Sequence, residues 1–276
     1  MPWNASLSLD YRLEAPRTLL RFSHDGPLRV LQSLYPEGCG ICHNVLVHPP
    51  GGLVEGDTLS VKVNVAAGAH ALISTPGATR FYRSKGQPAT QEVSLTLAEN
   101  ARLEWLPLET IAYPGCQALN RITLNLAPGA ELLAWDVTAL GLPGAQQAFD
   151  SGRLGQCLHW PGVWREQAHL DACDLSLLNS PLGLAGHRCM GTLVLASGTP
   201  MSATRRELLL DAVRQAIGTH ALAPTTGATC PDERVLVVRT LSPLVEPAMD
   251  LFKHLWAQLR PRLWQLGVTA PRIWGV

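Results

Sequence analysis

The stretch Leu59-Ser60-Val61-Lys62-Val63-Asn64-Val65 alternates apolar and polar residues without a break. A period of two is typical of a strand that has one face in a hydrophobic core. Gly68 follows, and glycine takes positive φ without steric cost, so a tight turn is expected there. Ala71-Leu72-Ile73 then starts a second apolar segment. This stretch predicts a strand–turn–strand unit.

The unit recurs twice further along the chain. Alternating pairs end at Val65, Leu97 and Leu126, turn residues follow at Gly68, Asn100 and Gly129, alanines follow at Ala69, Ala101 and Ala130, and apolar strands resume at Ala71, Leu103 and Leu132. A repeat of about 30 residues with two strands and a turn predicts coils that stack as a β-solenoid. Successive hairpins of a β-sandwich would give a similar pattern. The unequal spacing favours an irregular β-helix, so the chain is predicted to be mainly β.

The N-terminal and C-terminal parts of the chain differ in pattern. Leu7, Leu9 and Tyr11 alternate with polar residues and predict a strand. Strand-like segments continue to about residue 200, among them Leu170–Leu175 and Gly191–Ala196. We therefore assign residues 1–200 to a β-helical scaffold.

Residues 201–276 predict a helix–strand–helix part packed on that scaffold in a single structural unit. Thr204-Arg205-Arg206-Glu207 fits a capping box ahead of an amphipathic helix that Gly218 ends. Arg234–Arg239 predicts a strand. A second helical pattern begins at Val245, and Pro261 should kink or end it near Arg260.

The bulk composition excludes several classes of protein. Of 276 residues 46% are hydrophobic and 16% charged, which excludes a disordered chain. The formal net charge is zero, so neither nucleic acid nor an acidic membrane is expected as a partner. No apolar run is long enough to span a membrane. The N-terminus does not resemble a secretory signal, and seven cysteines then read as reduced thiols of a cytoplasmic protein.

Two glycine-bearing loops frame the first strand–turn–strand unit. One is His48-Pro49-Pro50-Gly51-Gly52-Leu53-Val54-Glu55-Gly56-Asp57, and the other is Thr75-Pro76-Gly77-Ala78-Thr79-Arg80-Phe81-Tyr82-Arg83-Ser84. The first spaces its glycines like a phosphate loop, but Asp57 stands where such a loop has lysine, and a carboxylate repels a triphosphate. The alternative for Asp57 is a turn cap. For the basic second loop, a partner-facing or solvated surface is favoured over phosphate or RNA binding.

Cys39-Gly40-Ile41-Cys42-His43 matches the C-x-x-C-H pattern of c-type haem attachment. Such attachment needs export, for which no signal is present. A structural zinc site would need two further ligands, and no second pair has suitable spacing. Ordinary reduced cysteines beside a strand are the favoured interpretation, with a transient soft-metal contact at Cys39, Cys42 and His43 as the alternative.

No catalytic constellation emerges from the sequence. The chain has neither a Gly-x-Ser-x-Gly elbow nor a His-Glu-x-x-His motif, and its histidines are scattered. Glu104, Glu109 and Asp136 lie in or beside the repeat strands, and any that point inward would need a partner or a cation. The alternation of Leu103 and Trp105 places Glu104 on the opposite face from those two residues. The protein is predicted not to be an enzyme.

Several segments together resemble one family. His48–Asp57, Pro76–Ser84, Leu103-Glu104-Trp105-Leu106-Pro107, Leu132-Leu133-Ala134-Trp135-Asp136, Leu259-Arg260-Pro261 and Pro271-Arg272-Ile273-Trp274 are similar, in this order, to segments of the urease accessory protein family UreD, called UreH in some systems. The similar segments span most of the chain. The Cys39–His43 motif is not part of the resemblance.

The resemblance implies a fold and a role. The fold is an irregular β-helix with a small helical part. The role is that of a non-catalytic maturation factor that acts with UreF and the GTPase UreG on the urease structural subunits and helps load nickel. It implies no tightly bound cofactor, but nickel in transit through an internal passage. Asp57, Glu104, Glu109 and Asp136 are the candidate lining residues, and the partner-facing candidates are His48, Pro49, Gly51, Gly52, Gly56, Asp57, Arg80, Tyr82 and Arg83.

Two alternatives remain open at this point. A β-solenoid adaptor without a metal role would bind partners but not nickel. An enzyme that uses the two loops would need a deep pocket joining them, with a base within reach. Stoichiometry, the faces that meet UreF or urease, and the route of the metal do not follow from the sequence.

Overall fold

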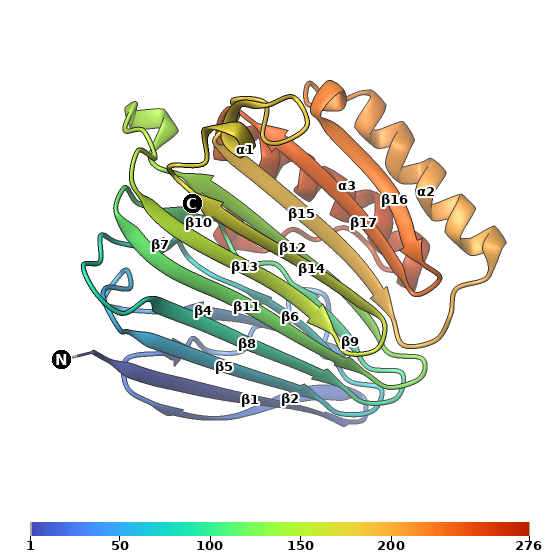
Figure 1. Ribbon diagram of the computed structural model, residues 1–276. Coiled ribbons are helices and arrows are strands. Elements are labelled where there is room, and N and C mark those ends of the chain that lie inside the picture. The colour runs from blue at the N-terminus through green and yellow to red at the C-terminus, as the bar shows by residue number, and fades with distance from the viewer. Residues whose placement is uncertain (1, 276) are drawn as a thin grey trace.

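Successive coils of the chain pass back and forth between two stacked β-sheets (Figure 1). The computed structural model describes residues 2–275. The first sheet has seven strands in the order β14-β13-β11-β8-β5-β1-β2, and the second has ten. The main path of the second sheet is β16-β17-β15-β12-β9-β6-β4-β3, and the short strands β7 and β10 are attached through β12. The predicted fold, mainly β with a solenoid-like stack of strands, is confirmed.

The strands have the following bounds. Those of the seven-stranded sheet are β1 (Asn4–Glu14), β2 (Arg17–Asp25), β5 (Thr58–Val65), β8 (Ala89–Leu97), β11 (Cys116–Leu126), β13 (Gly152–Trp160) and β14 (Trp164–Asp171). Those of the ten-stranded sheet are β3 (Arg29–Val30), β4 (Ile41–Val47), β6 (His70–Ser74), β7 (Thr79–Phe81), β9 (Arg102–Trp105), β10 (Thr110–Ala112), β12 (Glu131–Leu140), β15 (Cys189–Ser197), β16 (Thr226–Asp232) and β17 (Val235–Ser242).

The repeat found in the sequence is the coil of the solenoid. Strands β5, β8 and β11 pair in parallel in one sheet, and β6, β9 and β12 pair in parallel in the other. The three turn residues have positive φ, with Gly68 at 69°, Asn100 at 57° and Gly129 at 74°. Each coil also has a short third strand, because β7, β10 and the end of β12 pair in parallel. The sequence analysis did not predict this third strand.

The space between the sheets is filled by the alternating residues of the repeat. Val63, Leu95 and Leu124 stand in register on neighbouring strands and are fully buried. Their outward neighbours are polar and lie on the solvent side of the seven-stranded sheet. Burial of such aliphatic side chains contributes roughly 1.5–3 kcal/mol each, so the stacked rows hold the two sheets together.

The helices are α1 (Leu175–Asn179), α2 (Ala203–Gly218) and α3 (Val245–Trp264), with 3-10 turns η1 (Pro143–Ala145), η2 (Ala223–Thr225) and η3 (Arg272–Gly275). Helices α2 and α3 cover the outer face of the ten-stranded sheet, whereas Leu178 of the short helix α1 is buried in the core between the sheets (Figure 1). In α3 the side chains of Phe252 and Trp256 are buried in a second core that includes Trp135 of β12. The ten-stranded sheet therefore has a hydrophobic core on each face.

The C-terminal part differs from the sequence prediction in three details. Ser202, not Thr204, caps α2, because its side chain accepts a hydrogen bond from the Arg205 N–H. Helix α3 does not end at Arg260 but continues through Trp264. Pro261 lies in the last turn of the helix, and its carbonyl still accepts the hydrogen bond of the C-terminal cap from the Gln265 N–H. Strand β16 was missed, because it alternates half-buried and exposed residues and lacks an apolar face.

One further strand prediction was wrong in part. Strand β14 ends at Asp171, and residues 175–179 are helical because Asp174 caps them by accepting from the Leu177 N–H. Strands β15, β16 and β17 are antiparallel and extend the ten-stranded sheet. The assignment of residues 1–200 and 201–276 to two parts stays a prediction. Within residues 2–275, no helix combines the length and the apolar character needed to cross a membrane.

Candidate functional site

The two glycine-bearing loops lie against each other. Leu53 of the first loop pairs with the second, because its N–H donates to Arg80 O at 2.7 Å and its carbonyl accepts from the Tyr82 N–H at 2.9 Å. A Cβ on Gly52 would lie 2.3 Å from the Tyr82 ring, so only glycine allows this approach. Gly52 therefore stands where the two loops pack closely together, and we call this contact the loop joint.

A cavity of about 230 Å³ lies between the sheets next to this joint. Four of the predicted partner-facing residues line it, namely His48, Gly51, Gly52 and Arg80. Burial lowers the pKa of His48, and the charge of Asp57 opposes this shift in part. The Nε atom of Arg80 is buried and has no hydrogen-bond partner among the described residues. The loop joint is therefore one wall of an internal space.

The other predicted loop residues have local roles. Asp57 caps the turn of the first loop, because its carboxylate accepts from the backbone N–H groups of Trp3 and Val54, each at 2.9 Å. Gly56 takes the positive φ of that turn at 76°. The rings of Tyr82 and Tyr113 lie 4.8 Å apart. Pro49 and Arg83 are exposed. The contacts of Asp57 are therefore those of a turn cap, the alternative given in the sequence analysis.

A row of amide side chains on the seven-stranded sheet begins at this cavity and runs on to a smaller cavity beside it. Gln91, Asn120 and Gln156 are in register on β8, β11 and β13, at positions that otherwise carry inward-facing apolar residues. The Gln91 amide donates to Asn120 Oδ1 at 3.3 Å. The seven-stranded sheet thus contributes a polar stripe to an apolar interior.

Asp136 of β12 faces this row from the opposite sheet. Its carboxylate accepts hydrogen bonds from Asn120 Nδ2 at 2.9 Å, Thr138 Oγ1 at 2.8 Å and Gln156 Nε2 at 3.2 Å. Burial raises the pKa of Asp136, and the three hydrogen bonds only partly offset the rise. The nearby charge of Glu166 raises this pKa further. All of its hydrogen-bond partners are neutral.

The polar stripe continues toward the loops. Thr79, Thr110 and Thr138 are in register on the short third strands, and Thr79 and Thr110 line the cavity. A second cavity, of about 70 Å³, adjoins the first, since Asn120, Ile122 and Asp136 line both. Asp136 therefore stands where two internal spaces meet.

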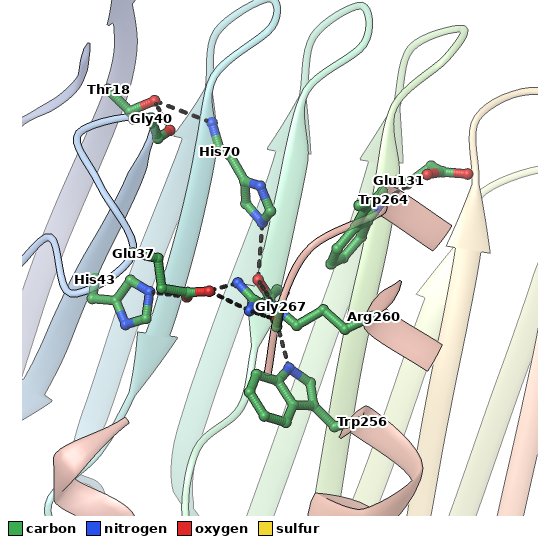
Figure 2. A network of polar contacts seen from close by, with 11 residues as sticks. Thr18, Glu37, Gly40, His43, His70, Glu131, Trp256, Arg260, Trp264 and Gly267 are labelled. Atoms are coloured by element: carbon green, nitrogen blue, oxygen red, sulfur yellow. Dashed lines mark hydrogen bonds and ion pairs between the residues drawn. The ribbon is translucent and has the colours of Figure 1, made fainter. Parts of the chain in front are cut away.

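Glu104 has a different location from the one expected for a passage. It lies on β9 and faces away from the space between the sheets, toward α3, where it is fully buried. Figure 2 shows the network there. Glu104 accepts from Trp256 Nε1 at 2.6 Å and from Arg260 Nε at 3.1 Å, and His70 Nε2 lies 2.9 Å from it.

The network extends to a second carboxylate. The Glu37 carboxylate accepts a hydrogen bond from Arg260 Nη2 at 2.8 Å and lies 2.9 Å from His43 Nε2 (Figure 2). Burial alone would raise the pKa of Glu104, but the hydrogen bond and charge of His70 and the charge of Arg260 outweigh it, so this pKa is lowered. The pKa of Glu37 is lowered in the same way by His43 and Arg260 against burial. The ion pairs fasten α3 to the sheet.

Of the four carboxylates predicted to line a passage, the structure places Asp136 alone at the cavity. Glu109 precedes β10 and is absent from the cavity wall, although its neighbours Leu108 and Thr110 belong to it. Asp57 and Glu104 line neither cavity. For these three residues the passage role stays a prediction that the geometry does not support.

The Cys39–His43 motif is not brought together as a ligand set. Cys42 and His43 are consecutive on β4, so their side chains point to opposite faces. Cys42 is buried in the core between the sheets and donates to Asn44 Oδ1, while His43 joins the Glu37 network. Burial raises the pKa of the Cys42 thiol. Within residues 2–275, no group of three or more His, Cys, Asp or Glu side chains is arranged to hold a metal ion.

Sequence reasoning missed the amide row, although a signal for it was present. Each amide interrupts an apolar series at an inward position, as Asn120 does between Ala118 and Ile122. A polar residue at such a position needs a buried partner. That rule would have selected Gln91, Asn120 and Gln156.

A mainly β solenoid with helices on the outer face of one sheet and a polar stripe between the sheets places this protein in the β-solenoid class. The family model of the UreD urease accessory protein matches residues 4–275. Urease accessory protein UreD of Albidiferax ferrireducens is 59% identical over 276 residues, with 100% of both chains covered. The same protein of Paracidovorax citrulli is 58% identical with 100% of both chains covered, and that of Variovorax paradoxus is 57% identical with 99% covered. The chain belongs to the UreD family of urease accessory proteins.

Proposed function

We propose that this protein is a non-catalytic chaperone of urease maturation that passes nickel through its interior while bound to UreF, UreG and the urease structural subunits. Family membership supports the maturation role. The observation that carries the nickel route is Asp136, a carboxylate placed where two internal cavities meet. An adaptor without a metal role would need no carboxylate at this place.

The physical argument concerns the cost of a cation between two sheets. A divalent ion in an apolar interior loses most of its hydration energy, so a route needs oxygen or nitrogen donors along it. The in-register Thr79, Thr110 and Thr138 and the amide row supply such donors, and Asp136 supplies negative charge. Because thiolates and histidines do not cluster there in the described residues, nickel would be held weakly and released again.

The test is urease activation in cells that carry the other urease proteins. Asp136→Asn should lower activation at least tenfold at limiting nickel while the variant still co-purifies with UreF. Glu166→Gln serves as a comparison, because Glu166 lines the smaller cavity but is engaged by Arg239 at 2.7 Å. We expect a smaller loss for that variant.

Activation of Asp136→Asn at the normal level would contradict the nickel route and favour the adaptor. Loss of UreF binding by the same variant would indicate a folding defect instead. In that case Thr110→Val, which removes one hydroxyl from the cavity wall at nearly constant volume, repeats the test.

A further inference from the structure

We propose that Arg80 and His48 bind a small planar monoanion of the carboxylate or bicarbonate class where the loop joint forms the wall of the larger cavity. The inference concerns an anion, goes beyond the proposed nickel route and does not rest on it. Its support is the unpaired guanidinium of Arg80, the turn that this side chain reaches, and the balance of charges on the cavity wall.

The guanidinium of Arg80 has no acceptor within the described part of the chain. Its Nε atom is buried without a hydrogen-bond partner, and no other buried side-chain nitrogen or oxygen of residues 2–275 is left in that state. None of the ion pairs formed by these residues includes Arg80. A buried charged donor without an acceptor is costly. An acceptor from outside the chain is therefore expected at this place.

The backbone fixes Arg80 beside the first loop. Its carbonyl accepts from the Leu53 N–H at 2.7 Å, and it stands in register with Ile111 of β10. Nη1 of Arg80 lies 4.0 Å from the position that a Cβ on Gly51 would take. Gly51 closes a turn with His48, because its N–H donates to His48 O at 2.9 Å. The guanidinium therefore reaches the turn that carries the His48 ring.

The charges of the wall match a single negative charge. Its titratable side chains are His48, Arg80 and Asp136, and of these only Arg80 is permanently positive. Burial lowers the pKa of His48, so at neutral pH its ring is neutral and offers one N–H donor. Asp57 acts on His48 by its charge, and Asp136 lies on the same wall. These two carboxyl groups disfavour a dianion more strongly than a monoanion.

The shape of the donor favours a planar anion. Nε and one Nη of a guanidinium form a fork whose two N–H groups match the two oxygens of a carboxylate. Bicarbonate and short carboxylates present such a pair of oxygens. The cavity of about 230 Å³ is many times larger than one water molecule needs, so an anion of a few heavy atoms fits. A water molecule would accept one hydrogen bond but leave the charge of Arg80 uncompensated.

A bound monoanion would also change the electrostatics of the cavity. The guanidinium alone repels any cation at this wall, whereas the guanidinium together with a monoanion is neutral. The anion would thus remove an electrostatic obstacle at the loop joint, without acting as a metal ligand.

The test is a titration of the full chain with ¹³C-labelled acetate and ¹³C-labelled bicarbonate at constant ionic strength, in complex with UreF where that keeps the chain in solution. Saturable broadening of the ¹³C NMR signal is expected for the wild type. Arg80→Gln should weaken binding of both anions at least tenfold. Arg80→Lys keeps the charge but loses the fork, and should weaken binding roughly threefold or more.

Arg83→Gln is the matched control. Arg83 lies in the same loop but is exposed and does not line the cavity, so this variant should leave both affinities unchanged. Inorganic phosphate should bind at least tenfold more weakly than acetate or bicarbonate. The ratio of the dissociation constants for these two tells whether the site prefers the O–H of bicarbonate or the methyl group of acetate.

Several results would overturn the anion site. They are wild-type binding that does not saturate, equal binding by Arg80→Gln and the wild type, and tighter binding of phosphate. If small anions do not bind and Arg80→Gln no longer co-purifies with UreF, Arg80 pairs with a carboxylate of the partner instead. If the variants fold poorly, the wild type decides, because the Arg80 Nε–H NMR signal should shift with the same dissociation constant. An unmoved signal would also overturn the site.

Discussion

Glu104 and Asp136 lie on neighbouring strands of one sheet and face opposite ways. Glu104 faces α3 and is held by Arg260, His70 and Trp256, so its pKa is lowered against the effect of burial. Asp136 faces the other sheet and is held by neutral groups alone, so burial prevails and its pKa is raised. The difference separates a carboxylate that fastens a helix through ion pairs from one that contacts only neutral groups between the sheets.

The largest test of this comparison is Glu104→Ala. The change leaves the guanidinium of Arg260 and the ring N–H of Trp256 buried without this acceptor. Removal of one partner from a buried ion pair costs about 3–5 kcal/mol, so the free energy of unfolding should fall by that amount. Urea denaturation of the full chain measures it.

Glu92→Ala is the matched control for that change. Glu92 and Arg121 form an ion pair whose side chains are about half exposed. Exposed pairs contribute roughly 0–1 kcal/mol, so the loss should be small. Equal losses in the two variants would refute the structural role given to Glu104.

A smaller effect is expected from Asp136→Asn. The substitution keeps the shape of the side chain but places an NH2 group against one of three donors, which costs about 1 kcal/mol. Urea denaturation should therefore show near-normal stability, in contrast to the loss of urease activation. A drop as large as that of Glu104→Ala would make Asp136 a structural residue and remove the contrast.

The smallest effect is the pH dependence of stability, where the two carboxylates should differ in sign. The pKa of Glu104 is lowered in the folded state, so its contribution is complete above the ordinary glutamate pKa and is lost as pH falls through the lowered value. The pKa of Asp136 is raised, so its contribution is complete below the ordinary aspartate pKa and is lost as pH rises through the raised value.

Free energies of unfolding measured across the acid range separate these two contributions. Glu104→Gln should flatten the fall of stability toward low pH. Asp136→Asn should instead remove a small decline above the ordinary aspartate pKa. The same change of slope in both variants would show that the two sites do not differ as described.

Local patterns were sufficient to predict two of the three strands of each coil. Alternation along residues 59–65 and turn residues such as Asn100 placed the paired strands and their positive-φ turns, because side-chain direction in a strand depends on parity alone. The face taken by Glu104 followed from the same rule. The pairing of β17 with β15 was not predictable, since α2 and β16 lie between these two strands in the sequence and no local pattern encodes the contact.

The site was predictable in part. The loop residues were predicted to face a partner, which stays a prediction, and the joint between the two loops was not predicted. Which carboxylates share one space depends on how the coils stack. Asp136 meets Asn120 and Gln156 across two sheets, and no local spacing encodes that contact. The Cys39–His43 motif shows the converse, because adjacent residues on a strand are separated by the strand itself.

The edge strands of the two sheets mark where the stack of coils begins and ends. Strands β2, β14, β16 and β3 each end a sheet path and run antiparallel to their neighbours. The series of parallel coils therefore ends at these strands. Each coil advances the stack by roughly 4.8 Å, so the number of coils acts as a ruler for the distance between its two ends. Insertion or deletion of one coil would shift the surfaces at the two ends of the stack relative to each other by that step.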